Sequence, residues 1–102
     1  MQNVYARCIA AYERAILFDP TNVKAAASLA MIYNEHGNFL RAEELFLQAL
    51  ETDPCDVDGL RRYGDFLAAR GLHEQSELFY LRRSSIMKQQ HEMYAKKVST
   101  SK

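Results

Sequence analysis

Apolar and small side chains recur along most of the chain at intervals of three or four residues. This spacing places them on one face of an α-helix, which turns once in about 3.6 residues. The pattern therefore predicts an all-α fold. The chain has 102 residues, of which 1–97 are expected to form a single domain and 98–102 a frayed tail. The expected helices cover about 3–18, 22–36, 39–52, 57–70 and 73–97.

Residues typical of helix ends lie between these segments. Asn22 can cap the second helix by accepting a hydrogen bond from a first-turn amide, and Asp56 can cap the fourth. Gly37 and Gly71 can adopt the left-handed conformation that ends a helix. Asp53 precedes a proline, which disfavours helical geometry and predicts the end of the third helix.

Two similar phrases, AILFDP at 15–20 and ALETDP at 49–54, occur 34 residues apart. Other positions repeat at the same step, which indicates a chain built from similar helix pairs. The recurring sets are Tyr12, Phe46 and Tyr80; Cys8, Ala42 and Ser76; and Gly37 and Gly71.

The middle repeat resembles the tetratricopeptide repeat. It carries the family's pattern at Leu29, Ala30, Tyr33, Ala42, Phe46 and Pro54. The next repeat keeps Gly64, Ser76 and Tyr80 but has Lys88 in place of the closing proline. The resemblance covers about residues 5–88. It implies about two and a half antiparallel helix-pair repeats in a right-handed superhelical stack, with a long C-terminal helix.

Small residues at recurring positions have a packing reason. Paired helices approach closely where one side is small and a larger neighbour fills the gap, as Ala30 and Gly64 would allow. We expect Tyr12, Phe46 and Tyr80 to be those larger neighbours and to lie in the core.

The resemblance implies a concave groove formed by the first helix of each pair, and a non-catalytic scaffold that binds a peptide or helix of a partner protein there. Some family members hold acidic chaperone tails with a clamp of basic residues and asparagine. Here only Arg62 matches a clamp position, and Asp58 has the opposite charge. By register, the groove residues are Lys24, Ala27, Ser28, Met31, Asn34, Glu35, Asp58, Arg61, Arg62, Asp65 and Ala69.

The two terminal helices carry apolar side chains for which the repeat pattern supplies no partner. Either the chain is a fragment of a longer repeat protein, or a second copy covers the first helix, as in a homodimer. The last helix either folds back as a cap or projects to pack on another subunit. The self-association candidates are Tyr5, Ile9, Ile16, Phe79, Ile86 and Met93.

Charge is balanced overall but unevenly distributed. Thirteen basic and thirteen acidic residues give zero net charge, which argues against a nucleic-acid or membrane partner. Residues 34–58 have a net charge of −6 and residues 59–102 of +5. This uneven distribution of charge either orients a partner protein, or a second copy of the chain in a head-to-tail contact, or only reflects solvent-exposed helix faces. A nucleic-acid-associated protein that uses the basic C-terminal helix is the alternative function.

Candidate chemistry is sparse. His36, His73 and His91 are far apart in the sequence, so no metal site, catalytic group or cofactor is expected, and we predict that the chain is not an enzyme. No apolar run approaches the roughly 18 residues of a membrane span. Cys8 and Cys55 form no disulfide framework, so the cytoplasm is the default compartment.

Overall fold

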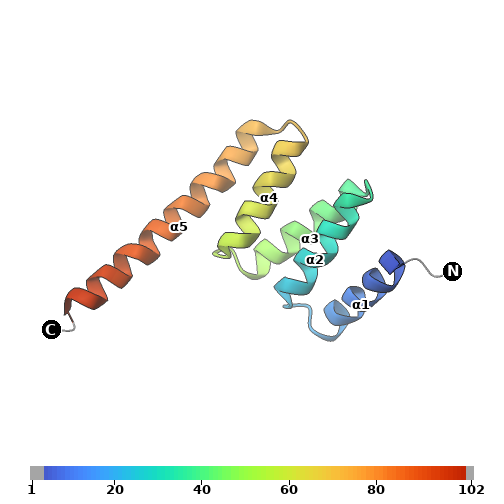
Figure 1. Ribbon diagram of the computed structural model, residues 1–102, viewed down its shortest axis with the longest axis horizontal. Coiled ribbons are helices and arrows are strands. Elements are labelled where there is room, and N and C mark those ends of the chain that lie inside the picture. Colours follow the sequence, from blue (N-terminus) through green and yellow to red (C-terminus); the bar gives the residue numbers. More distant parts are fainter. Residues whose placement is uncertain (1–3, 101–102) are drawn as a thin grey trace. The chain divides into compact units, whose positions relative to one another are not determined.

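A computed structural model describes residues 4–100, which form five α-helices and contain no strand (Figure 1). The predicted all-α fold is confirmed, and the first four helices differ from prediction by at most one residue at either end. α5 continues through Thr100, beyond the predicted end at 97, because no proline or glycine interrupts it. Residues 101–102 of the expected tail lie outside the described part. The helices are α1 Val4–Phe18, α2 Val23–Glu35, α3 Phe39–Thr52, α4 Val57–Ala69 and α5 His73–Thr100.

Local signals account for most helix ends. Asn22 caps α2, because its side-chain oxygen accepts a hydrogen bond from the Ala25 amide at 3.0 Å. Gly37 and Gly71 have φ angles of 79° and 80°, in the left-handed region as predicted. Asp56 occupies the N-cap position of α4, but its side chain makes no capping hydrogen bond, so that part of the prediction is wrong.

The turn after α1 is held by Asp19. Its carboxylate accepts hydrogen bonds from the backbone amide of Thr21 at 3.0 Å and from the Thr21 hydroxyl at 2.6 Å. The hydroxyl bond, followed by the amide bond, lowers the pKa of Asp19 below its ordinary 3.8. Because the folded-state pKa is lowered, this stabilisation is present above pH 3.8 and is lost as the pH falls through the lowered value.

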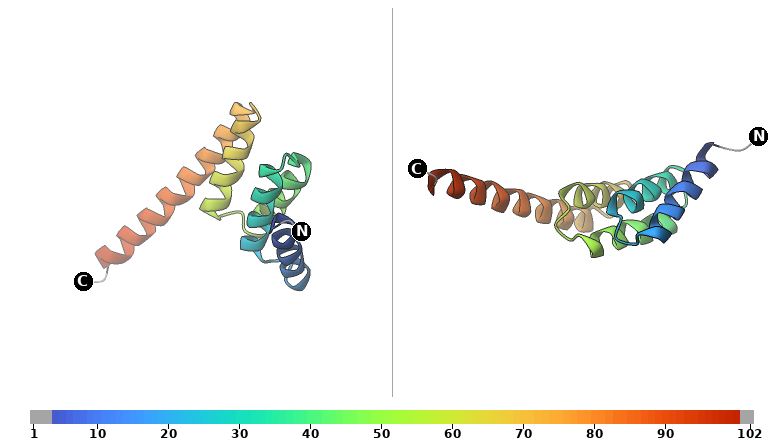
Figure 2. Two further views of the ribbon diagram at one scale, coloured as in Figure 1. Left: turned by 45° about the vertical axis from the view of Figure 1, so that its right-hand side comes forward. Right: turned by 90° about the horizontal axis from the view of Figure 1, so that it is seen from below.

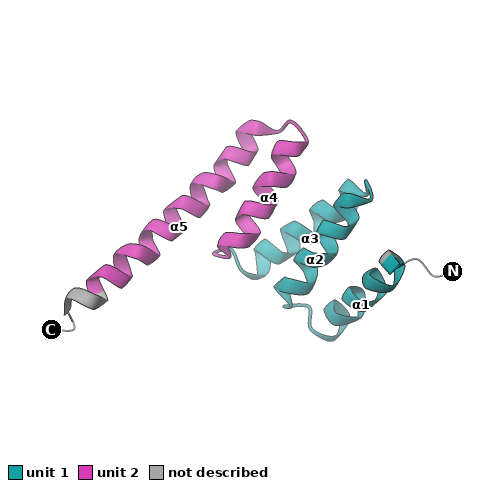
Figure 3. Ribbon diagram, viewed as in Figure 1, with its two compact units in different colours: residues 1–54 teal, residues 55–102 magenta. Residues whose placement is uncertain are grey.

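The chain divides into two compact units, residues 1–54 and residues 55–102 (Figure 3). The first unit contains α1, α2 and α3, and the second contains α4 and α5. A single domain over 1–97 stays a prediction.

In the first unit, α2 and α3 lie side by side and α1 packs on α2 (Figure 1). The buried face of α2 is mostly alanine, which allows close approach of the neighbouring helices. No described side chain of α1 is fully buried, because this helix packs against other helices on one side only. The buried residues of the unit are Ala25, Ala26, Ala27, Leu29, Ala30, Ala42, Leu45, Phe46, Ala49 and Leu50.

In the second unit, α4 packs on the first half of α5. The helices approach closely at Gly64, where an added Cβ would lie 2.7 Å from Cε1 of Tyr80. Next to this contact, the rings of Tyr63 and Phe79 meet edge to face at 4.8 Å. Among the described residues of α5 only Ser76 is buried, and the helix continues well beyond α4 (Figures 1 and 2).

The three recurring aromatic residues differ in burial. Phe46 is buried, with 4% of its surface exposed, as predicted. Tyr12 and Tyr80 are only half-buried, so their assignment to the core is wrong. Tyr12 lies on the one-sided helix α1, and Tyr80 packs its ring on Gly64 while its hydroxyl reaches the surface to donate a hydrogen bond to Asp65.

Candidate functional site

The predicted groove residues of α2 share one face of the helix. Met31 is 44% exposed, and Lys24 and Glu35 are also exposed, whereas Ser28 and Asn34 are half-buried. Ala27 is only 3% exposed, because it faces the helix packing and offers little surface to a partner. The exposed side chains of this face are therefore the ammonium of Lys24, the thioether of Met31 and the carboxylate of Glu35.

A hollow of about 280 Å³ lies between α1 and α2. Lys24, Ser28 and Tyr12 all line this hollow. The sequence pattern assigned Tyr12 to the core and not to a binding surface. An ammonium and a hydroxyl next to an aromatic ring suit a partner's carboxylate or small amphipathic side chain. The lining residues are Tyr12, Ala15, Asn22, Lys24, Ala25 and Ser28.

On α4, the predicted groove residues Arg61 and Asp65 form a charged cluster with Tyr80 of α5. Arg61 Nη1 lies 3.8 Å from Asp65 Oδ2, and the Tyr80 hydroxyl donates a hydrogen bond to the same carboxylate. That hydrogen bond, followed by burial, raises the pKa of Tyr80. Arg62 is half-buried. Asp58 and Ala69 are exposed at the two ends of the helix. The two predicted groove faces belong to different units.

A polar cluster links the three helices of the first unit. The Tyr33 hydroxyl donates a hydrogen bond to Glu13 Oε1 at 2.9 Å, which joins α2 to α1. The Arg41 guanidinium lies 6.0 Å from the centre of the Tyr33 ring and pairs with Glu44 at 3.1 Å. Burial, followed by the bond to Glu13, raises the pKa of Tyr33. The repeat pattern contained Tyr33 but not its partners.

We expect Tyr33→Phe to lower the free energy of unfolding by about 1 kcal/mol, because it removes the hydrogen bond and keeps the ring. Amide hydrogen exchange in α1 should become faster. In the unmodified chain this contribution is present below pH 10.0, the ordinary pKa of tyrosine, and is lost as the pH rises through the raised folded-state pKa. Urea unfolding across alkaline pH and hydrogen exchange measure both effects.

Tyr94→Phe is the matched control, since Tyr94 is 69% exposed and should change neither quantity. Equal exchange rates in α1 of the Tyr33→Phe variant and of the unmodified chain would contradict the proposed role of this bond.

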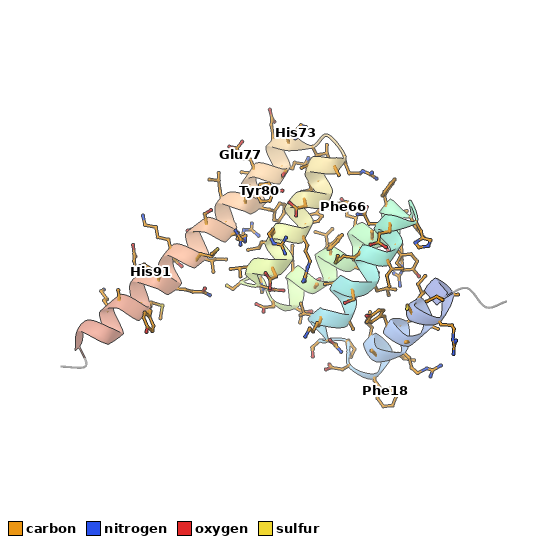
Figure 4. The ribbon with its side chains drawn as sticks, in the orientation of Figure 1. Phe18, Phe66, His73, Glu77, Tyr80 and His91 are labelled. Carbon is orange, nitrogen blue, oxygen red and sulfur yellow. The ribbon has the colours of Figure 1, made fainter. Side chains whose placement is uncertain are left out.

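The self-association candidates do not form one continuous exposed face. Ile9, Ile16 and Ile86 are half-buried, and the half-buried Phe79 packs on Tyr63 of its own chain. Met93 is 71% exposed. The side chain of Tyr5 lies outside the described residues. At the end of α1, Leu17 and Phe18 are 83% and 88% exposed although neither was a self-association candidate, and Phe18 points away from the helices (Figure 4).

The described residues contain no group of three or more His, Cys, Asp or Glu side chains that could hold a metal ion. His36 Nδ1 lies 3.0 Å from the Ile32 carbonyl oxygen at the end of α2. His73 and His91 lie on α5, well separated (Figure 4). Cys8 and Cys55 are not joined by a disulfide. No described helix has the length and apolar character needed to cross a bilayer.

Residues 11–44 match the family described as tetratricopeptide repeat. Over these residues the chain is similar to a tetratricopeptide repeat. The matched segment takes in the end of α1, all of α2 and the start of α3, so the family resemblance is confirmed there. The matched segment includes the Tyr33–Glu13 bond and the exposed face of α2.

Two crystal structures of MamA have a similar fold. Their TM-scores are 0.75 and 0.73, each at 18% sequence identity, and each match covers 82% of this chain. The matches cover 49% and 46% of the MamA chains, so this chain spans about half their length. At this identity the likeness extends to the helix-repeat fold alone. No curated protein sequence matches the chain.

Proposed function

We propose that the chain is a non-catalytic scaffold and that the exposed faces of α2 and α4 each bind a peptide or helix of a partner protein. The observation that carries this proposal is the two-sided character of α2. One side of this helix is buried alanine, which packs the repeat, whereas Lys24, Met31 and Glu35 remain exposed on the other. Methionine adapts its shape to different apolar partners, and the flanking charges select orientation.

The tetratricopeptide repeat supports this proposal at the level of the fold, because stacked helix pairs present extended surfaces for protein partners. The charges add a preference for partner chemistry. Lys24, Arg61 and Arg62 favour carboxylates, whereas Asp58 and Glu35 favour basic side chains. We therefore propose a partner segment that carries both charges around an apolar side chain.

The test begins with the selection of a binding peptide from a displayed peptide library on the purified chain. The selected peptide is then labelled, and its binding is measured by fluorescence anisotropy. We expect Arg61→Glu combined with Arg62→Glu to weaken its binding about tenfold, because two attractions become repulsions. Circular dichroism should show unchanged helicity.

Arg7→Glu with Arg14→Glu is the matched control, since both arginines are exposed on α1 and the change in net charge is the same. Equal weakening in both double variants would indicate a general charge effect and contradict the proposed surface. Unchanged binding in the α4 variant would contradict it as well.

The nucleic-acid alternative is a second hypothesis, and the observation that favours it is that Lys88 and Lys96 are exposed on α5. Binding of single-stranded RNA that falls steeply with salt would support this alternative. No RNA binding at low salt would exclude it.

A further inference from the structure

The second half of α5 has no cover from α4. Every residue from 87 to 96 is exposed, and the ribbon of α5 runs beyond the start of α4 in each view (Figures 1 and 2). The exposed side chains include Met87 at 43%, Met93 at 71% and Tyr94 at 69%. A short helix without tertiary packing is marginal in water, so this segment would gain stability from a partner surface.

Basic residues flank the apolar side chains of this segment. Arg82, Ile86, Met93 and Lys96 lie on one helix face at i, i+4, i+11 and i+14, with Gln89 between the two apolar residues and a cation at each end. Between Arg82 and Lys96 the helix carries four basic residues against Glu92 alone. A complementary surface should therefore be apolar and flanked by carboxylates.

The exposed face of α3 has this composition. Leu40, Glu44, Leu47 and Glu51 lie along one face of the helix, which we name the α3 stripe. Leu40 is 74% exposed and Leu47 is 45% exposed, and both glutamates are exposed. The leucines of the stripe offer apolar surface, and the glutamates offer charge opposite to that of α5.

A hollow of about 400 Å³ lies between α1, α2 and α3, about a quarter turn round α3 from the stripe. Arg41, Leu45 and Gln48 line it, and each follows a stripe residue by one position. The hollow is large enough for an apolar side chain from a docked helix. Its other lining residues are Glu13, Ile16, Leu17, Pro20 and Leu29.

We propose that residues 82–96 of α5 dock on the α3 stripe of a second copy of this chain. Ile86 and Met93 are seven residues apart, as are Leu40 and Leu47, so they pack on these leucines in a parallel arrangement, and Lys96 then lies near Glu51. Pairing two α5 helices would instead bring like charges together, which disfavours that arrangement. The contact uses surfaces other than the α2 and α4 faces that are proposed for partner binding.

The proposed contact joins two different surfaces, so it is heterologous. Each copy keeps one free α5 and one free α3 stripe after the first contact, and further copies therefore add head to tail into rings or open chains. Light scattering over a dilution series should show a mass that rises past two copies with concentration.

Charge reversal tests the pairing directly. Arg82→Glu with Lys96→Glu should weaken association about tenfold, and Glu44→Lys with Glu51→Lys should do the same. An equimolar mixture of the two double variants should regain assembly, because each variant's altered surface then meets an altered surface of opposite charge.

Arg7→Glu with Arg14→Glu is the control and should assemble like the unmodified chain. A monomer at every concentration of the unmodified chain would overturn the proposal, and so would failure of the mixture to recover. Assembly that stops at two copies and strengthens when the α5 variant is mixed with unmodified chain would indicate α5–α5 pairing and would also overturn it. Peptide binding by the α2 and α4 faces should persist in both charge variants. The peptide assay therefore tests the proposed function, and the association assay tests the proposed contact between copies.

Discussion

Leu60→Ala is expected to lower the free energy of unfolding by about 3 kcal/mol, since it removes a fully buried side chain and leaves a cavity. Leu60 lies on α4 with 0% of its surface exposed. Domains of this size have a total stability of about 5–15 kcal/mol, so the loss is a large share. Urea unfolding followed by circular dichroism measures it. Leu81→Ala on α5 is the control, because Leu81 is 60% exposed and should change stability by less than about 0.5 kcal/mol.

Leu45→Ala makes the same change in the first unit, where Leu45 is 1% exposed. If residues 1–97 form one cooperative domain, Leu45→Ala and Leu60→Ala should each shift a single unfolding transition. Two transitions, of which each variant shifts one, would contradict the single-domain prediction. A Leu60→Ala chain as stable as the Leu81→Ala control would contradict the assignment of Leu60 to the core.

The helices could be predicted closely because their ends depend on local chemistry. Asn22, Gly37 and Gly71 act through hydrogen bonds or backbone angles within a few residues of themselves. The same reasoning could have found Asn38, whose side chain accepts a hydrogen bond from the Arg41 amide at 3.4 Å and caps α3. Asp56 shows the limit of this approach, because a residue of the right type at the N-cap need not make the bond.

The surfaces were harder to predict, because a periodic pattern shows which residues share a helix face but not what covers that face. Phe79 and Met93 fall on one heptad spacing, yet Phe79 packs on Tyr63 and Met93 is exposed, since α5 is longer than α4. The bond between Tyr33 and Glu13 joins residues 20 positions apart, which is not a repeat of the 34-residue period.

Gly64 and Tyr80 are expected to be strongly coupled. In the unmodified chain, Gly64→Ala should destabilise by about 1–2 kcal/mol, because the added methyl group would lie 2.7 Å from the Tyr80 ring and the contact is overpacked. When Tyr80 is already alanine, the same change should stabilise by about 1 kcal/mol, since alanine favours the helix more than glycine does. The coupling free energy between the two positions is therefore about 2–3 kcal/mol.

Tyr80→Phe separates the ring from the hydroxyl. It removes the hydrogen bond to Asp65 and keeps the ring atoms that face Gly64. Gly64→Ala should therefore remain destabilising in the Tyr80→Phe chain, and urea unfolding of the six chains in this cycle measures each step. If Gly64→Ala has the same effect whether residue 80 is tyrosine or alanine, α4 and α5 do not meet closely at this point, and the small-to-large packing inferred from the repeat is wrong.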